Sequence, residues 1–494
     1  MNKQYIDIPI YTTYDNISSK NFSLSATQYK TFYIKNKNTI TVQDFLSRNL
    51  ERNDLGSEVG SDAYVESSNY FFIKTKALQS ETYLLDNSKD AIQNITPMSY
   101  INTQLKKGDL LISKDSNVGE IAILDRDYPN TMLCSGIYKL PVNSKKYYLL
   151  AFIKNQIFRQ QIDFLVPRGS TIRHGKTKFL ECLIPLPTKN EANTVKYVEI
   201  LTEAIVNKER KIIEKYNLCS EMIVNELKNN QKENSFKYSL PNINEIIKNE
   251  RMDTKLYSNE YKQAVFLIEN YLNGYFTIPI KKIHGGNTPK KRILSEEGDL
   301  DYFWVTPTIF SNHGLLTTKN SINCEAVNIK KNSLLIVNRT SKGGEGKYVG
   351  MSYFYNINEL GKGQYNQGIY GISDFSDEEL YYFNALINST IYRTIFSKLA
   401  MGSKMKEIKQ KQLSQLKFPN FPQKIKNTIV GLYCNNSVEY DISKCTLESF
   451  LEYDNSFNSV AGIYELDKSK KYLQDKLEQA IAHIADNEVI ETYF

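Results

Sequence analysis

The chain has 494 residues, of which 41% are hydrophobic and 24% charged, so it is long enough for two or more cores and does not have the composition of a disordered protein. Its 35 Tyr and 23 Phe beside a single Trp favour abundant strands. The net charge of +7 is compatible with a polyanionic partner but is not enough to indicate one.

The six cysteines are scattered, without a CxxC pair or a Cys/His cluster at metal-ligand spacing. We therefore expect reduced thiols that mostly fill cores, and no metal site. The first residues contain no apolar signal segment, and nowhere do about 18 apolar residues run together as a membrane span requires. The expected location is the cytoplasm, with no membrane contact.

Residues 1–190 are predicted to form a first domain. Residues 69–78 (NYFFIKTKAL) contain a strand, and residues 106–124 (KKGDLLISKDSNVGEIAIL) contain two strands joined by a polar, glycine-bearing turn. Residues 146–162 (KYYLLAFIKNQIFRQQI) have helical apolar spacing. Residues 168–187 (RGSTIRHGKTKFLECLIPLP) end this domain with a basic turn and a proline-bearing exit.

Residues 191–240 are predicted to contain a long amphipathic helix. Residues 191–235 lack Gly and Pro, and apolar side chains recur at intervals of three and four. A 40-residue helix would be about 60 Å long, and its apolar stripe needs a partner. The stripe, which we expect to be a partner-docking surface, consists of Val198, Leu201, Ile205, Ile212, Tyr216, Ile223 and Leu227.

Residues 241–424 repeat the first domain. The corresponding segments are 301–310 (DYFWVTPTIF) with 69–78, 330–351 with 106–124, 380–396 (LYYFNALINSTIYRTIF) with 146–162, and 401–420 (MGSKMKEIKQKQLSQLKFPN) with 168–187. Only two copies are visible, at a period far longer than that of a solenoid. The sequence therefore predicts a duplicated domain.

Residues 425–494 form a C-terminal region. Its final part, residues 469–488, has an apolar stripe similar to that of the long helix, so we expect a second spacer helix that pairs antiparallel with the first as a coiled coil. A Tyr-, Asp- and Ser-rich insert, residues 440–458, precedes it. The predicted fold class is α+β, with two tandem β-rich domains separated by long helices.

Catalytic motifs are not found in the sequence. Residues 340–350 (TSKGGEGKYVG) depart from a phosphate-binding loop, since Ser341 replaces its first Gly and Tyr348 its Ser/Thr, and a hairpin tip is favoured. There is no NPPY-like methyltransferase segment, GxGxxG or HExxH. His174 has basic neighbours but no nucleophile in its motif, which favours a surface or core histidine over a catalytic one.

Polar and basic turns recur at corresponding places in both copies. Their side chains can donate to phosphate oxygens, and Arg and Asn can read guanine and adenine edges. The alternative is that they are merely solvated loops. The candidate DNA contacts are Lys74, Lys76, Lys114, Ser116, Asn117, Arg168, Ser170, Thr171, Arg173, His174, Lys176, Asn287, Thr288, Lys290, Lys291, Arg292, Arg339, Thr340, Ser341, Lys342, Ser403, Lys404 and Lys406.

Several segments resemble the specificity subunit of type I restriction-modification systems. Residues 280–291 (IKKIHGGNTPKK), followed by YFWVTPTIF, are similar to the family's GGTP loop and its W-I/V-T-P strand end. Residues 107–113 (KGDLLIS) are similar to its GDILIS strand. Residues 168–171 (RGST) and 183–187 (LIPLP) are similar to its G-S/T-T turn and I-P-L-P exit into the long helix. The resemblance covers residues 20 to 425, approximately.

The resemblance implies two target-recognition domains, each binding half of a bipartite double-stranded DNA target, and two helices that fix the spacer and dock two methyltransferase subunits. It implies that this chain is non-catalytic and needs no cofactor. Adenine N6 methylation would belong to the methyltransferase subunits, which carry S-adenosylmethionine and flip the base. Cleavage of foreign DNA would belong to a restriction subunit that uses ATP and magnesium.

A two-part target explains a duplicated but non-identical domain, because reading two major-groove segments on one face of a duplex needs two readers about 34 Å apart. A phosphate role for Arg168, Arg173 or Arg339 predicts that alanine there weakens binding to every duplex and lowers its salt dependence.

Two departures from the family pattern concern the first copy and the C-terminus. The first copy has residues 49–68 (NLERNDLGSEVGSDAYVESS) in place of a GGTP loop, and residues 427–494 are not an obvious copy of the first long helix. Two other functions stay open. One is a single-chain nuclease or methyltransferase with unrecognised motifs, which would show cofactor-dependent activity. The other is an RNA-binding or scaffold protein, which would prefer single strands or bind no nucleic acid.

Overall fold

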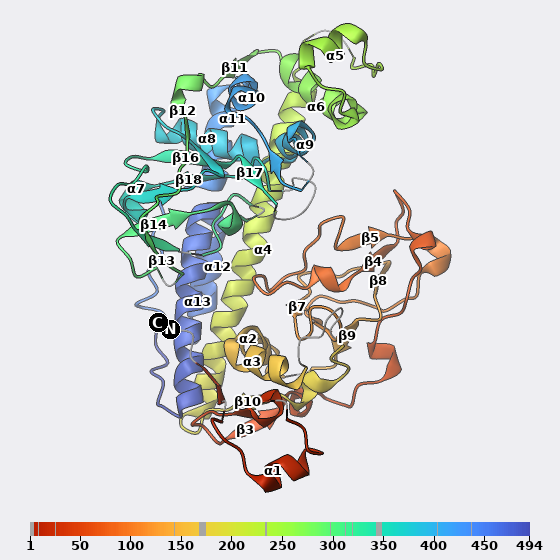
Figure 1. Cartoon of the computed structure of the whole chain (residues 1–494), viewed down its shortest axis with the longest axis vertical. Coiled ribbons are helices and arrows are strands. Elements are labelled where there is room, and N and C mark those ends of the chain that lie inside the picture. Colours follow the sequence, from red (N-terminus) through yellow and green to blue (C-terminus); the bar gives the residue numbers. More distant parts are fainter. Residues whose placement is uncertain are drawn as a thin grey trace. The chain divides into compact units, whose positions relative to one another are not determined.

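The computed structural model describes residues 4–7, 9–24, 26–142, 144–166, 174–232, 235–296, 298–311, 313–318, 320–341, 348–402, 404–435 and 437–494. The chain forms two compact units. Unit 1 consists of Met1–Arg210, Tyr440–Ser459 and Lys468–Phe494, and unit 2 of Lys211–Glu439 and Val460–Asp467. Figure 1 shows the elements of each unit, coloured along the chain.

Unit 1 contains two three-stranded sheets, in the orders β5-β4-β8 and β7-β6-β9. The pairing of β4 with β8 is parallel, and the other pairings in these sheets are antiparallel. The predicted strand in KGDLLIS is β6, whose four residues are all buried, as expected for a strand covered on both faces. The bounds are β4 (Phe71–Ile73), β5 (Ile92–Asn94), β6 (Leu110–Ser113), β7 (Ile121–Ile123), β8 (Thr131–Leu133) and β9 (Ile137–Leu140).

The helical segment of the first copy is broken into α2 (Lys146–Lys154) and α3 (Gln156–Leu165). Asn155 separates them, because its extended backbone ends α2 while its side chain accepts from the Ile157 amide and caps α3. The exit strand β10 (Leu183–Pro185) pairs antiparallel with β3 (Thr39–Thr41).

Unit 2 repeats these pairings, which confirms that the sequence repeat is a structural repeat. Its β14·β19 pair is parallel like β4·β8, its β16·β18 hairpin is antiparallel like β6·β7, and β11·β22 corresponds to β3·β10. Two four-stranded sheets have the orders β12-β20-β16-β18 and β13-β15-β14-β19. The bounds are β11 (Tyr275–Thr277), β12 (Ile283–Gly285), β13 (Ile293–Ser295), β14 (Tyr302–Val305), β15 (Ser321–Asn323), β16 (Ser333–Val337), β18 (Ser352–Tyr355), β19 (Gly363–Tyr365), β20 (Ile369–Ile372) and β22 (Lys417–Pro419).

The helices of the second copy are α8 (Asp377–Asn388) and α9 (Thr390–Leu399), which correspond to α2 and α3. A capping box of Ser376 and Glu379 begins α8. Ser389, in extended conformation, takes the place of Asn155 between the two helices.

The long helix α4 (Glu191–Asn229) has 39 residues, of which those to Arg210 belong to unit 1 and the rest to unit 2. It ends six residues before the end of the run without Gly and Pro at 235, because the chain turns there: the Asn230 side chain donates back to the Glu226 carbonyl at 3.1 Å, and the Lys232 amide donates to the Asn270 carbonyl at 2.8 Å. The spacing of apolar residues along the chain does not predict these hydrogen bonds, and so does not predict where the helix ends.

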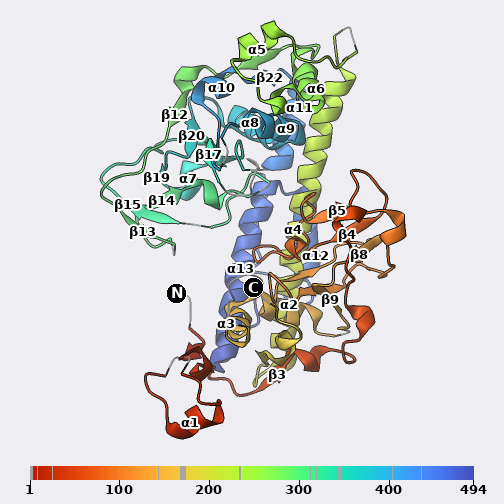
Figure 2. The ribbon, with the colours of Figure 1, turned by 45° about the vertical axis from the view of Figure 1, so that its right-hand side comes forward.

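The C-terminal helices are α11 (Gln423–Tyr433), α12 (Phe450–Val460) and α13 (Ile463–Asp486). Within unit 1, the Thr188 hydroxyl bonds to Asn487 at 2.6 Å, and Lys208 Nζ donates to Asn458 at 2.8 Å. The residue numbers therefore rise along α4 in the direction in which they fall along the C-terminal helices. The unit 1 parts of α4 and α13 run antiparallel and lie side by side in Figures 1 and 2. Coiled-coil packing between them stays a prediction.

The insert at residues 440–458 is held in unit 1 by a wholly buried ion pair. Lys208 of α4 lies 2.8 Å from Asp454 of α12, and both side chains have no exposed surface. The Tyr440 hydroxyl donates to Asp454 at 2.7 Å, and the ring of Tyr440 lies 4.3 Å from Lys208 Nζ. Burial lowers the pKa of Lys208 to about 8, although Asp454 opposes this shift.

All six cysteines are free, and Cys182, Cys219 and Cys434 are buried. Burial raises the pKa of both Cys182 and Cys219 to about 12, so these thiols fill cores. In the described part of the chain, no helix is both long and apolar enough to cross a membrane. The same residues contain no group of three or more His, Cys, Asp or Glu placed to hold a metal ion.

Candidate nucleic-acid interface

In unit 1, the turn after β6 is joined to the segment that follows α3. The Lys114 amide donates to the Gly136 carbonyl at 2.8 Å, and the Gly175 amide donates to the Lys114 carbonyl at 2.7 Å. Asp115 and His174 then face each other across an antiparallel bridge. Two basic turns that are 59 positions apart at this bridge thus lie side by side. We call residues 114–117 and 174–176 the unit 1 junction.

The same backbone arrangement occurs in unit 2. The Asn338 amide donates to the Gly368 carbonyl at 2.9 Å, and the Ile408 amide donates to the Asn338 carbonyl at 2.8 Å. Strand β17 (Arg339–Thr340) pairs antiparallel with β21 (Lys406–Glu407), so that Arg339 is opposite Glu407. We call residues 338–341 and 404–407 the unit 2 junction. The adjacent candidates Lys342 and Ser403 lie outside the described residues.

At each junction a glycine allows the backbone to pass close to the side chain of a neighbouring turn. A Cβ on Gly136 would lie 2.6 Å from the Thr75 side chain, and one on Gly368 would lie 2.6 Å from Pro307. These neighbours come from the turns after β4 and β14, and so bring Lys74 and Lys76 toward the unit 1 junction. Lys74 Nζ stacks 4.7 Å from the Tyr64 ring, while Lys76 pairs with Asp90 at 3.1 Å.

The charges of the unit 1 junction centre on Asp115. Its carboxylate accepts from Lys114 Nζ at 2.7 Å and lies 2.8 Å from His174 Nδ1. The Asp115 side chain is 17% exposed, whereas that of His174 is 65% exposed. His174 is a surface histidine, as expected, but its carboxylate partner was not predicted. Ser116, Asn117 and Lys176 are also exposed.

The charges of the unit 2 junction are arranged differently. Arg339 and Glu407 are half-buried, and within the described ranges neither side chain makes a hydrogen bond or ion pair. Burial raises the pKa of the neighbouring Tyr370, Glu407 adds to this and Arg339 opposes it, so the three groups share one environment. Thr340 is buried with 7% exposure, which contradicts its prediction as a DNA contact, because the antiparallel pairing turns it inward.

The GGNTP loop lies beside the unit 2 junction. The Gly286 amide donates to the Ile369 carbonyl at 3.1 Å, and Asn287 Oδ1 accepts from Gln364 at 3.0 Å. The Thr288 hydroxyl bonds to Gln367. Asn287 and Thr288 therefore hold the loop in place, while the following Lys290, Lys291 and Arg292 are exposed.

Four predicted contacts of the first copy, Arg168, Ser170, Thr171 and Arg173, lie outside the described residues. Of the remaining candidates in the second copy, Ser341 and Lys404 are exposed and Lys406 is half-buried. The unit 1 junction thus contains the candidates Lys114, Ser116, Asn117, His174 and Lys176, and the unit 2 junction contains Arg339, Thr340, Ser341, Lys404 and Lys406.

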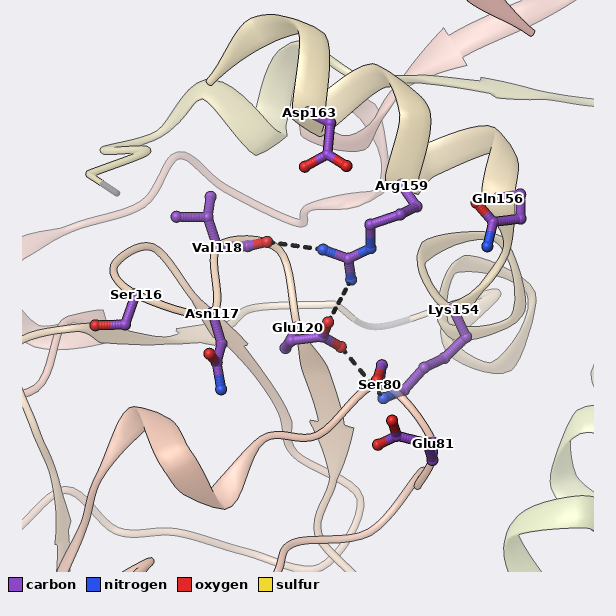
Figure 3. A pocket seen from close by; sticks show the side chains of 10 residues that line it. All are labelled: Ser80, Glu81, Ser116, Asn117, Val118, Glu120, Lys154, Gln156, Arg159 and Asp163. Atoms are coloured by element: carbon purple, nitrogen blue, oxygen red, sulfur yellow. Dashed lines mark hydrogen bonds and ion pairs between the residues drawn. The ribbon is translucent and has the colours of Figure 1, made fainter. Parts of the chain in front are cut away.

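A polar cavity of about 470 Å³ opens beside the unit 1 junction, with Ser116 and Asn117 on its wall (Figure 3). Glu120 accepts from Arg159 at 2.8 Å and lies 3.9 Å from Lys154 Nζ. Burial raises the pKa of Glu120 and lowers that of Lys154 to about 8. Nothing in the spacing of residues 120, 154 and 159 indicated this charge cluster.

The second copy shows that the fold does not require these charges. By the repeat, Met351 corresponds to Glu120 and Asn388 to Lys154, and only Arg393 keeps the charge of Arg159. Asn388 instead donates to the Ser352 hydroxyl and carbonyl at 3.0 Å. Comparing the two copies position by position could have revealed a charge cluster peculiar to the first.

The apolar stripe of α4 is not a free docking surface, which corrects the sequence prediction. Val198, Leu201, Ile205, Ile223 and Leu227 have no exposed area, Ile212 is 2% exposed, and the Tyr216 hydroxyl donates to the Asn388 carbonyl at 2.7 Å. The chain's own core covers the stripe, so a partner would have to use other faces of the helix.

No protein-family model and no curated protein matches the chain. Solved structures similar to it include a type I restriction-modification S subunit from M. genitalium, at 12% identity over 90% of this chain and 95% of that one, with a TM-score of 0.40. Another comes from work on assembly and conformational transition of the type I R-M system, at 12% identity, 93% and 100% coverage and a TM-score of 0.28. A third is the HsdS subunit from Thermoanaerobacter tengcongensis, at 12% identity, 91% and 97% coverage and a TM-score of 0.25.

Proposed function

We propose that this chain is the non-catalytic DNA-specificity subunit of a type I restriction-modification complex, and that it recognises a bipartite duplex. The observation that carries the proposal is the pair of junctions. The same backbone hydrogen bonds in both units present different polar and charged side chains. A target with two unlike halves needs two readers that share a scaffold and differ at their contact positions.

In this proposal the exposed cations hold phosphates. Lys176 in the first copy, and Lys290, Lys291 and Lys404 in the second, are exposed at or beside the junctions. Each such contact releases condensed counterions from the duplex, so binding falls steeply with salt. The other polar side chains of the junctions would face the bases.

The partners in this proposal are two methyltransferase subunits and, in a complex that cleaves DNA, restriction subunits. S-adenosylmethionine, ATP and magnesium would be bound by those partners. Because the apolar stripe of α4 is already buried, docking would use solvent-exposed side chains of the long helices. In unit 1, Tyr472 of α13 is 45% exposed, and in unit 2, Leu218 of α4 is 47% exposed.

The test is to co-express the chain with the methyltransferase encoded beside it and to map adenine methylation in the host genome by long-read sequencing. We expect a bipartite motif that disappears when the chain is deleted, and of which one half changes when one copy is exchanged. Methylation that needs no second subunit would indicate a single-chain enzyme. A complex that methylates nothing and prefers single strands would indicate an RNA-binding or scaffold protein.

A further inference from the structure

We propose that Arg339 and Glu407 read one G·C base pair for the second copy, and that Asp115 and His174 form the specificity-determining pair at the same place in the first. The inference rests on the proposed function and deepens it, because it assigns the choice of base to named positions. It concerns two cross-strand pairs that the duplication places in equivalent surroundings.

The register places each pair on one face. Directly opposed residues on antiparallel strands have Cβ atoms about 5 Å apart and project to the same side. Arg339 is opposed to Glu407 in this way, as Asp115 is to His174. In unit 2, a hydrogen bond from the Asn338 amide to the Gly368 carbonyl fixes the backbone just before Arg339. In unit 1, a hydrogen bond from the Lys114 amide to the Gly136 carbonyl does the same before Asp115. Both pairs are thus presented by an ordered backbone.

The chemistry of the unit 2 pair suits a base pair better than a phosphate. The Glu407 side chain lies on the presented face and makes no hydrogen bond or ion pair with any described residue, although Arg339 is opposite. A carboxylate close to a phosphate is repelled, but it can accept from cytosine N4 in the major groove. Arg339 can at the same time donate two bonds to guanine O6 and N7.

A neighbouring lysine supplies the attraction to the DNA backbone that this pair does not. Lys404 is exposed, three residues before Glu407. Lys406 is opposite Thr340 and so projects to the other face of the strand from Glu407. Lys404 therefore keeps the junction attractive to DNA while leaving the Glu407 carboxylate for a base edge. The unit 2 junction therefore separates phosphate holding from base reading.

In the unit 1 pair the carboxylate is already engaged, and the histidine is the side chain that would contact the base. Asp115 is occupied by Lys114 and His174, so it is a positioning residue that sets the ring of His174. A carboxylate beside Nδ1 keeps the proton on that nitrogen in the neutral imidazole, which leaves Nε2 as an acceptor. His174 can then accept from an adenine or cytosine amino group, but no arginine stands beside it to require guanine.

The experiment compares Glu407→Gln, Arg339→Ala and His174→Ala in the complex with the methyltransferase, by mapping the methylated motif. Glu407→Gln and Arg339→Ala should each reduce discrimination about 5- to 150-fold at one G·C position of one half-site. The other half should stay unchanged. His174→Ala should change only that other half. Lys404→Gln is the matched control, since it should weaken binding to all duplexes and reduce the salt slope without changing the motif.

An unchanged motif in a complex of normal thermal stability would overturn the assignment of Arg339 and Glu407. Uniform weakening on every duplex with a flatter salt slope would also overturn it, and would make Arg339 a phosphate contact. In both cases the unaltered complex would still produce its bipartite motif, so the proposed function would stand. A failure of the proposed function is distinguished by the absence of that motif before any substitution is made.

Discussion

Lys208 and Asp454 are both completely buried, and each is the other's charge partner. Replacing Lys208 by Met would leave the Asp454 carboxylate in the core with Tyr440 and Asn458 as its remaining hydrogen-bond partners among the described residues. We expect Lys208→Met to destabilise unit 1 by roughly 3–5 kcal/mol, because the unpaired charge keeps its desolvation penalty. Urea unfolding followed by far-UV circular dichroism measures the effect.

Two controls separate the buried charge from the loss of a lysine as such. Lys196→Met removes a surface partner of Glu448 and should hardly change the urea midpoint, since exposed ion pairs contribute little. The double variant Lys208→Met/Asp454→Leu should recover most of the lost stability. If the double variant is as unstable as the single one, then the unpaired carboxylate is not the cause.

At the scale of elements, two adjacent glycines after β12 differ in what surrounds them. A Cβ on Gly286 would lie 2.0 Å from the Asn366 carbonyl oxygen and 2.6 Å from the Tyr365 ring, whereas a Cβ on Gly285 would meet nothing within 4 Å. We expect Gly286→Ala to push the GGNTP loop away from β19 and β20 at a cost of about 1–3 kcal/mol. The thermal unfolding of unit 2, followed by Trp304 fluorescence, measures it.

Gly285→Ala is the matched control and should leave that unfolding transition where it is. A similar decrease in both variants would mean that the loop is sensitive to any added side chain, and not that Gly286 is needed for the close approach.

The elements predicted from sequence are those set by local pattern. The buried run of β6 and the three-and-four spacing of α4 were both predicted, and the repeat gave their counterparts in the second copy. The parallel pairing of β4 with β8 was not predicted, because it joins segments that are distant in sequence. Nothing in the sequences of these two strands indicates which residues are paired. The end of α4 within the predicted range 191–240 could not be assigned for a similar reason, since it depends on the distant Asn270.

The candidate site shows the same division. The polar turns that make the junctions were predicted from their repetition. Their meeting was not, because Lys114 is held by the carbonyl of Gly136 and by the amide of Gly175, contacts that no spacing rule contains. Thr340 was misjudged because one step along a short strand turns a side chain from the surface to the core.

At the scale of the whole molecule, unit 1 is built from both ends of the chain. The Asn36 side chain donates to the Ile484 carbonyl at 2.8 Å, its amide donates to the Ala485 carbonyl at 2.9 Å, and Phe494 stacks on Phe450 at 3.9 Å. We expect removal of residues 468–494 to abolish hydrogen-exchange protection of α4 within residues 195–206, because its covering helix is lost. Strand β16 of unit 2 should keep its protection.

Trp304 lies in unit 2 and is the chain's only tryptophan, so its fluorescence gives an independent check that unit 2 remains folded in the truncated chain. Tyr472→Ala serves as the control on α13, since Tyr472 is 45% exposed and its loss should leave α4 protected. Equal loss of protection in both units would show that they unfold together.

The two-ended construction of unit 1 has a consequence during synthesis. Most multidomain chains fold from the N-terminus as they leave the ribosome, at roughly 5–20 residues per second. Here the first copy to emerge cannot complete its core until residues 468–494 follow, whereas unit 2 needs nothing beyond Asp467. On the ribosome the second copy is therefore finished first, and the first copy waits on the order of tens of seconds with an incomplete core, open to chaperones and proteases.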